Sequence, residues 1–318
     1  DIVALADLGN YLTTYTGAYA DQNQLDPPPA GQPAPNSQNL AVAVSVNVFN
    51  TDNVTRAAIR DGARIDLSDA AGDLDGDVSV TALQRGLFTH MQNFPTDLRT
   101  ITDPIGSDDN VSNRIGGAVT LARTVSRVEA LVEGGAEIKA DTLDIDAHNR
   151  AIVFNLVYAG GAAANVAINA AIAAQAVENV TIARLSDRAT ITTGDLTVTA
   201  LDDSFIMGLA GAFAGSDGSV SVGASGVVNF AKRQVYAGIG PAARGAALGG
   251  TAGEVRITAR SLTIRADNDA ITVATAVAGS RVSGKPVDDS APPQEEENDE
   301  DMILSLIHIS EPTRLRRI

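Results

Sequence analysis

The feature that most constrains how this 318-residue chain can fold is a short repeated pattern. Each copy reads polar, apolar, polar, β-branched, polar, Ala, and consecutive copies start between 53 and 66 residues apart. The four copies occupy residues 77–82, 142–147, 195–200 and 261–266. Recurrence at such a period indicates a repeat architecture, in which each unit buries its apolar face only by stacking on its neighbours.

The rest of each unit recurs as well. A second strand-like segment precedes each copy, a third lies further upstream, and an apolar stretch rich in small residues follows. The segments that directly precede the pattern are 64–66, 137–140, 189–192 and 255–259. The segments further upstream are 42–49, 118–122, 166–171 and 220–230. The apolar stretches that follow the pattern are 151–159, 204–213 and 270–278. We align the opening residues 2–9 with the apolar stretches. The chain then holds about four and a half copies of one unit, cut within a unit at both ends.

The period inside each unit is two, which is typical of half-buried β-strands. In one copy Leu196, Val198 and Ala200 share a face, and the intervening threonines share the other. Breaks such as residues 193–195 reset this phase and are too short for a helical crossover, so they suit corners where the chain turns onto the next face. We therefore predict an all-β fold, a parallel β-solenoid (β-helix) of about four and a half degenerate repeats of 53–66 residues. With 4% aromatic residues and no Trp, its interior is predicted to hold Ala, Val, Ile, Leu and Gly.

We expect residues 1–280 to form the repeat array, with loop insertions at 21–39 and 85–114, and residues 281–302 to be a Pro-rich acidic loop or linker. Insertions in repeat arrays gather on one face, often the binding face. Residues 305–314 read SLIHISEPTR, which resembles the peptide obtained when sequencing-library adapter DNA is translated. We interpret residues 303–318 as a non-native tail, and we expect the natural protein to be longer at both ends.

Composition excludes several kinds of chemistry. The chain has no Cys, which excludes disulfides and thiolate metal sites, and its three His are far apart. A net charge of −16 argues against nucleic-acid binding, which needs a basic surface. The candidate metal ligands are Asp73, Asp75 and Asp77, which resemble part of a calcium loop. They lack the acid that such a loop has at its twelfth position, where this chain has Gln84. A solvated acidic turn is the preferred interpretation, so we assign no metal and no cofactor.

His148 could join Asp144, Asp146 and Ser126 in a triad, but a triad is defined by geometry, which one sequence does not contain. Its position directly after a strand favours an ordinary exposed polar residue.

The neighbouring acids Asp202 and Asp203 could serve as the carboxylate pair of a glycosidase or lyase. Acids recur at the equivalent strand end of the next copy, at Asp267 and Asp269. Repetition favours a structural turn over a unique active site. We assign no catalytic residue and predict that the chain is not an enzyme.

Residues 151–177 hold 27 positions without charge, enough for a membrane-spanning helix. Four polar residues within the stretch oppose such a span: Asn155, Asn165, Asn169 and Gln175. The alternation also fits strands better. We predict no stable transmembrane span.

Three motifs carry a family resemblance: DLTVTA at 195–200, VSVNV followed by Asn50 at 44–50, and IRDGARI at 59–65. Together with the apolar stretches, they resemble the giant repetitive filamentous adhesins of Gram-negative bacteria, and most closely the leukotoxin-type members. The resemblance covers most of residues 2–280. It implies a secreted, surface-displayed β-helical rod that acts in attachment or in host-cell damage, and it supplies no catalytic residues.

We therefore expect a fragment of a large adhesin on the bacterial outer surface or outside the cell, monomeric as a fragment, which binds a receptor or glycan on a host or neighbouring cell. The first alternative is a membrane-damaging toxin segment, which rests on the apolar residues 151–177 and 204–230. The second is a β-helix carbohydrate-active enzyme, which needs a unique cluster of acids on one face.

Overall fold

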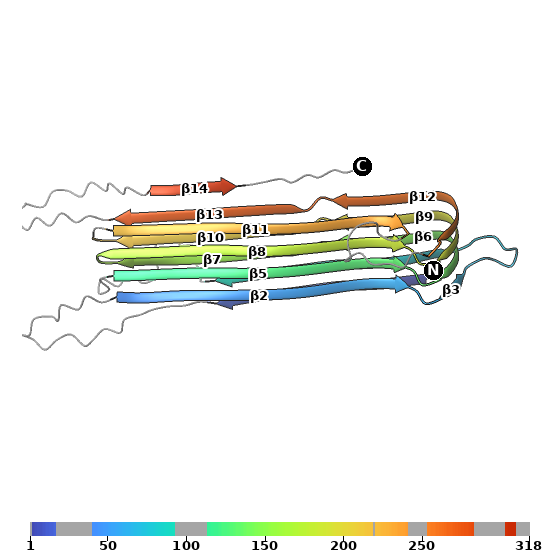
Figure 1. Ribbon diagram of the computed structural model, residues 1–318, viewed down its shortest axis with the longest axis horizontal. Helices are drawn as coiled ribbons and strands as arrows, with labels where there is room; N and C mark the ends of the chain where they lie inside the picture. Colours follow the sequence, from blue (N-terminus) through green and yellow to red (C-terminus); the bar gives the residue numbers. More distant parts are fainter. Residues whose placement is uncertain are drawn as a thin grey trace, which may run out of the picture.

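The computed structural model describes residues 2–16, 40–92, 113–218, 220–240 and 253–282, and the backbone of 303–309. Within these ranges the chain is all-β and contains no helix (Figure 1). The strands are β1(Ile2–Thr16), β2(Leu40–Ile59), β3(Arg64–Asp66), β4(Asp77–Gln92), β5(Asn113–Val132), β6(Glu137–Asn149), β7(Ile152–Ala163), β8(Val166–Leu185), β9(Thr190–Asp202), β10(Phe205–Ser216), β11(Val220–Ile239), β12(Arg256–Asn268), β13(Ile271–Val282) and β14(Ile303–Ile309).

These strands form two sheets. The long-strand sheet holds four parallel 20-residue strands in the order β11-β8-β5-β2. The short-strand sheet contains the other strands, and all its pairs are parallel except β13 with β14. In each unit the chain runs out along one long strand and returns along two short ones, and the two sheets face one another (Figure 1).

The repeat found in the sequence is also the unit of strand pairing. Asp77 pairs with Thr142, Thr142 with Asp195, and Asp195 with Ser261. The alanines that end the four copies align in one row: Ala82, Ala147, Ala200 and Ala266. The predicted all-β fold with parallel pairing of these copies is confirmed, and the pairing is in register.

Two details of the predicted organisation are wrong. Residues 2–9 pair with residues 78–85 of β4, so they align with the Ala-terminated pattern and not with the apolar stretches. The break at 193–195 does reset the phase, but β9 continues through it in the same sheet, so it is not a corner onto another face. The preference for strands over a helix in residues 151–177 agrees with the structure, because nearly all of them lie in β7 and the first part of β8.

The second expected insertion is shorter than predicted, because residues 85–92 lie in β4 and residues 113–114 lie in β5. Residues 93–112, the insertion at 21–39 and most of 281–302 lie outside the described residues. The strand ends that flank these segments lie together at one end of the stack, where β1, β4 and β13 end and β2 and β5 begin (Figure 1).

The interior changes character along the strands. At the end where the long strands finish, large aliphatic side chains form the main core, with Ile138, Leu143 and Ile145 exposed by 1% or less. At the end where the long strands begin, the buried residues are mostly Ala with polar side chains such as Asn169 and Gln175. Burial of apolar surface therefore stabilises mainly the first of these two ends.

Candidate functional site

A line of buried polar side chains separates the two ends of the interior. The Asn179 amide on β8 donates from Nδ2 to Asp202 Oδ2 at 3.2 Å and to Ser204 Oγ at 2.8 Å. Asp202 is fully buried, and burial raises the pKa of its carboxyl, while hydrogen bonds from Ser204 and Asn179 oppose that shift. Asp202 thus links the two sheets from inside the molecule.

The position of Asp202 is occupied by a polar residue in each neighbouring unit. Gln84, Asn149, Asp202 and Asn268 align in one row across β4, β6, β9 and β12. In the last three, the side-chain Oδ1 accepts the backbone N–H two residues later: at Ala151 (3.2 Å), Ser204 (3.1 Å) and Ala270 (3.4 Å). This repeated Asx turn shapes the bend between the two short strands of each unit.

Asp203 lies on the opposite side of the strand from Asp202. Its Oδ1 is 3.1 Å from His148 Nε2, and its Oδ2 is 3.4 Å from Arg150 Nε. The two adjacent acids therefore do not share a face, as the carboxylate pair of a glycosidase must.

The structure does not assemble the triad considered from the sequence. His148 lies on the outer side of β6, together with Asp144 and Asp146. Burial raises the pKa of the Asp146 carboxyl. Ser126 is fully buried between the sheets, where its Oγ accepts a hydrogen bond from Gln84 Nε2 at 2.8 Å. The hydroxyl and the imidazole are on opposite sides of the short-strand sheet.

The three candidate calcium ligands are engaged separately. Asp75 Oδ1 accepts the N–H of Gly76 at 2.8 Å, and Asp77 accepts a hydrogen bond from the Thr142 hydroxyl. Asp73 lies in the turn, where its backbone N–H donates to Asp69 Oδ1 at 2.9 Å. Within the described part of the chain, no group of three or more His, Cys, Asp or Glu side chains could hold a metal ion.

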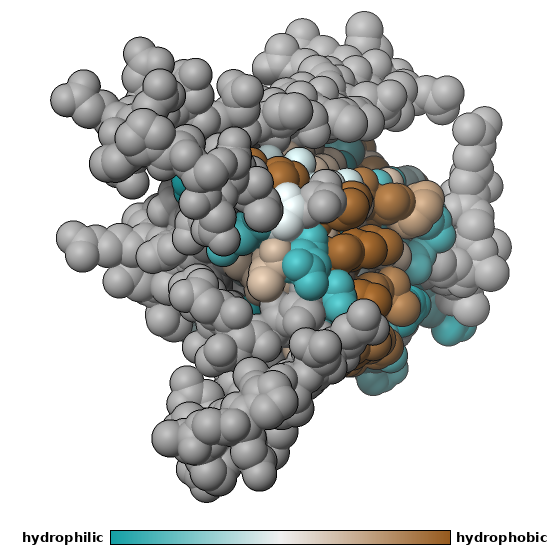
Figure 2. Space-filling model, turned by 90° about the vertical axis from the view of Figure 1, so that its left-hand side faces the viewer, coloured by the Kyte–Doolittle hydropathy of each residue, from teal (hydrophilic) through white to brown (hydrophobic). Residues whose placement is uncertain are grey.

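The sequence did not indicate how apolar the outside of the long-strand sheet is. Alternate side chains over the first half of its strands point outward and are apolar, and several are exposed by 45–72%, as in Val46, Val48 and Ile172. We call this surface the apolar face. It consists of four register rows: Val42, Ile115, Ile168 and Val222; Val44, Gly117, Ala170 and Ala224; Val46, Val119, Ile172 and Gly226; Val48, Leu121, Ala174 and Val228. Figure 2 shows apolar side chains gathered along this side of the molecule.

The other sheet is also apolar outside at this end. Phe154 and Phe205 lie on neighbouring strands β7 and β10, with ring centroids 5.8 Å apart. Ile152 and Ile271 of the same surface are exposed by 39% and 56%. At the opposite end, outward positions such as Thr197 and Thr263 are polar.

A charged row borders the apolar face. Asp52, Val125, Glu178 and Lys232 align across the four long strands. Lys232 Nζ lies 2.6 Å from Glu178 Oε1, and this contact lowers the pKa of Glu178. Arg123 from the preceding row donates from NH1 to Asn50 Oδ1 at 3.1 Å.

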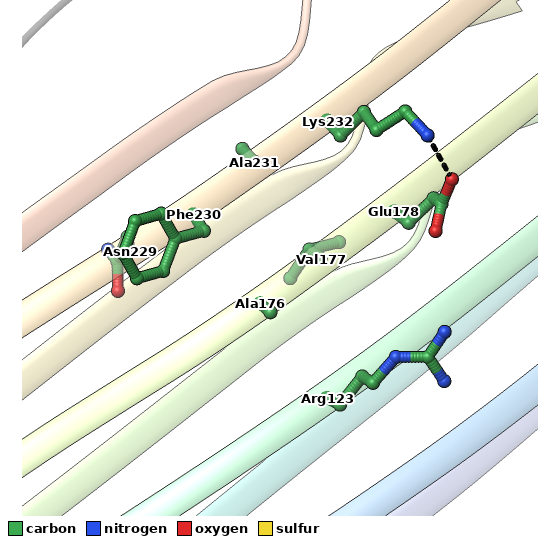
Figure 3. Close-up of a pocket in the computed structure, with 8 residues that line it drawn as sticks. All are labelled: Arg123, Ala176, Val177, Glu178, Asn229, Phe230, Ala231 and Lys232. Atoms are coloured by element: carbon green, nitrogen blue, oxygen red, sulfur yellow. Dashed lines mark hydrogen bonds and ion pairs between the residues drawn. The ribbon is translucent and has the colours of Figure 1, made fainter.

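Arg123, Glu178 and Lys232 line a shallow depression of about 420 Å³ on β5, β8 and β11, together with Phe230 and its neighbours (Figure 3). Phe230 stands at one side and is 68% exposed, and the Glu178–Lys232 pair stands at the other. Lys232 contacts Glu178 and Arg123 contacts Asn50, so the charged groups that line the depression have partners within the chain.

Comparison with known protein families, with curated proteins and with solved structures finds no match for this chain. No helix in the described ranges is long and apolar enough to cross a membrane. The fold and the surfaces above are therefore the basis for the functional proposal.

Proposed function

We propose that the chain is a segment of a β-solenoid rod from a large secreted or surface-displayed adhesin, which presents binding surfaces and carries out no catalysis. The observation that carries the proposal is the in-register parallel pairing of successive units, from Asp77 through Thr142 and Asp195 to Ser261. Repeat units that contact only their neighbours can be added without changing the fold, so they suit a protein whose role requires length.

The surfaces agree with a binding role. The strand ends that flank the three connections lie at one end of the stack, and insertions in repeat arrays often gather on the binding face. The acids that could have suggested catalysis are used for turns or ion pairs, as Asp202 and Asp203 show. The partner that fits this account is a receptor or glycan on a host or neighbouring cell.

The test is binding of the fluorescently labelled full chain to mammalian and bacterial cells. We expect saturable binding that excess unlabelled chain displaces. The matched control is Ile145→Asp, which buries a charge in the main core and unfolds the chain. Binding that is absent from every cell type, or equal for this unfolded variant, would refute the adhesin proposal. Turnover of polysaccharides by the same preparation would favour the enzyme alternative.

A second candidate function is that of a membrane-damaging segment. The specific observation in its favour is the apolar exterior of both sheets at the same end, represented by Val46 and Ile271. The test is leakage of dye from neutral and anionic vesicles at increasing protein concentration. Leakage that Val46→Lys abolishes would support this function, and intact vesicles at saturating protein would exclude it.

A further inference from the structure

We propose that the apolar face of the long-strand sheet is a docking surface for the same face of a second copy of this chain, which gives a twofold dimer. This inference does not depend on the adhesin proposal. It replaces our expectation of a monomer, which took no account of the exposed rows of Val46 and Ile172.

The area of the face is sufficient for a dimer. Four strands at about 4.8 Å spacing and nine residues from Leu40 to Val48 at about 3.3 Å per residue cover about 550 Å² per copy. Two such faces bury about 1,100 Å² in total, which passes the roughly 1,000 Å² needed by a specific interface. A contiguous exposed apolar patch of this size is at the upper limit for a soluble monomer.

The order of charges beside the face makes it complementary to itself. From β2 to β11, the bordering rows carry Asp52, Arg123, Glu178 and Lys232, so the sign alternates across the sheet. Consider a twofold axis parallel to the strands, between β5 and β8 and midway between two stacked sheets. It places β2 over β11 of the second copy and β5 over β8. Asp52 then faces Lys232 of the second copy, and Arg123 lies next to its Glu178.

The same operation pairs a large side chain with a small one at some positions: Val44 and Val46 of β2 come over Ala224 and Gly226 of β11 in the second copy, and Leu121 of β5 comes over Ala174 of β8. At other positions large apolar side chains meet, as Val42 does with Val222. Sheets that stack face to face interdigitate in this way at about 10 Å separation. Lipid binding requires only an apolar surface and makes no use of alternating charges. These features therefore favour a second copy as the occupant of the apolar face.

The test is sedimentation velocity and light scattering of the full chain over a concentration series. We expect a dimer at micromolar concentration. Val46→Lys and Ile172→Lys each place a charge in the interface and should weaken dimerisation about tenfold or more. Thr197→Lys, on the polar outer side of β9, is the matched control and should leave the dimer unchanged. Circular dichroism establishes whether each variant is folded. One folded interface variant, either Val46→Lys or Ile172→Lys, is enough to decide the test.

Charge reversal gives a second readout. Lys232→Asp places like charges opposite each other and should weaken the dimer, and adding Asp52→Lys should restore it. A monomer at all concentrations would overturn the proposal. So would a dimer that both interface variants leave intact, or one that Thr197→Lys weakens equally. A monomer that binds neutral phosphatidylcholine vesicles through Val46 would identify lipid as the occupant instead, and would also overturn it.

Discussion

The side-chain amide Nδ2 of Asn179 donates a hydrogen bond to Asp202 Oδ2 at 3.2 Å between the two sheets, where both residues are exposed by 1% or less. Asp202 also accepts the N–H of Ser204 and so ends one short strand and begins the next. This contact therefore couples the local bend of each unit to the packing of the two sheets.

Replacement of Asp202 separates its hydrogen-bonding role from its charge. Asp202→Ala leaves the Ser204 N–H and the Asn179 amide without this acceptor, and it should lower the free energy of unfolding by about 1–3 kcal/mol. Urea denaturation at neutral pH measures this change. A loss below about 0.5 kcal/mol would show that the contact does not support the fold.

Asp202→Asn is the matched variant, because Asn149 and Asn268 occupy the same row. Burial raises the pKa of Asp202 above its ordinary value of 3.8, so ionisation costs stability as the pH rises past that value. The asparagine variant should equal the wild type below pH about 4 and exceed it at neutral pH. Lower stability of this variant at neutral pH would contradict the account.

For His90 we predict the opposite pH dependence: its contribution to the free energy of unfolding decreases as the pH falls. It is 1% exposed, stacks on Phe49 with ring centroids 4.2 Å apart, and burial lowers its pKa to about 4. The unfolded chain takes up a proton near pH 6.5, so the stability that neutral His90 contributes is lost as the pH falls from about 6.5 to about 4.

The expected loss across that window is as much as about 3 kcal/mol. His90→Asn is the matched variant, because Asn155 occupies the paired position on β7. Urea midpoints at pH 7 and pH 5 should differ less for this variant than for the wild type. Equal differences would show that His90 does not titrate with folding.

Gly194 lies where the phase of β9 is reset, and a side chain has no room there. A Cβ at this residue would stand 2.8 Å from the backbone oxygen of Asp141 on the neighbouring strand. Gly194→Ala should therefore destabilise the chain by about 1–3 kcal/mol through overpacking. Gly9→Ala is the control, because a Cβ there would meet only the edge of the Tyr11 ring, at 4.0 Å. Thermal melts should separate the two variants, and equal melting temperatures would contradict the close approach.

The part of the fold that could be predicted from the sequence is the part that repeats. The pattern ending in Ala82, Ala147, Ala200 and Ala266 contains both the strand period and the register, because successive units bury the same positions. The alternation of polar and apolar residues also changes phase at Gly194 in the sequence. Such a change is expected both for a bulge within one sheet and for a corner between two sheets, so the sequence does not distinguish them.

The surfaces could not be predicted in the same way. Period-two alternation in Val42, Val44 and Val46 identifies a strand, but either side of such a strand can face the interior. The usual assumption places the large apolar side chains inside, and the structure places these valines outside while Ser45 and Asn47 are buried. Likewise, His148 and Asp203 belong to neighbouring units, so no sequence pattern within either unit indicates that they are in contact.

The parallel, in-register stacking of the units is tested most directly by disulfide trapping, because the chain has no cysteine of its own. Thr197 and Thr263 are paired on the outer side of β9 and β12. Paired strands place Cα atoms about 5 Å apart, which a disulfide can bridge. The account predicts rapid oxidation of the Thr197→Cys, Thr263→Cys double variant and no bridge in the Thr199→Cys, Thr263→Cys variant, which is offset by two residues. Bridging of the offset pair, or of neither pair, would contradict the register on which the account rests.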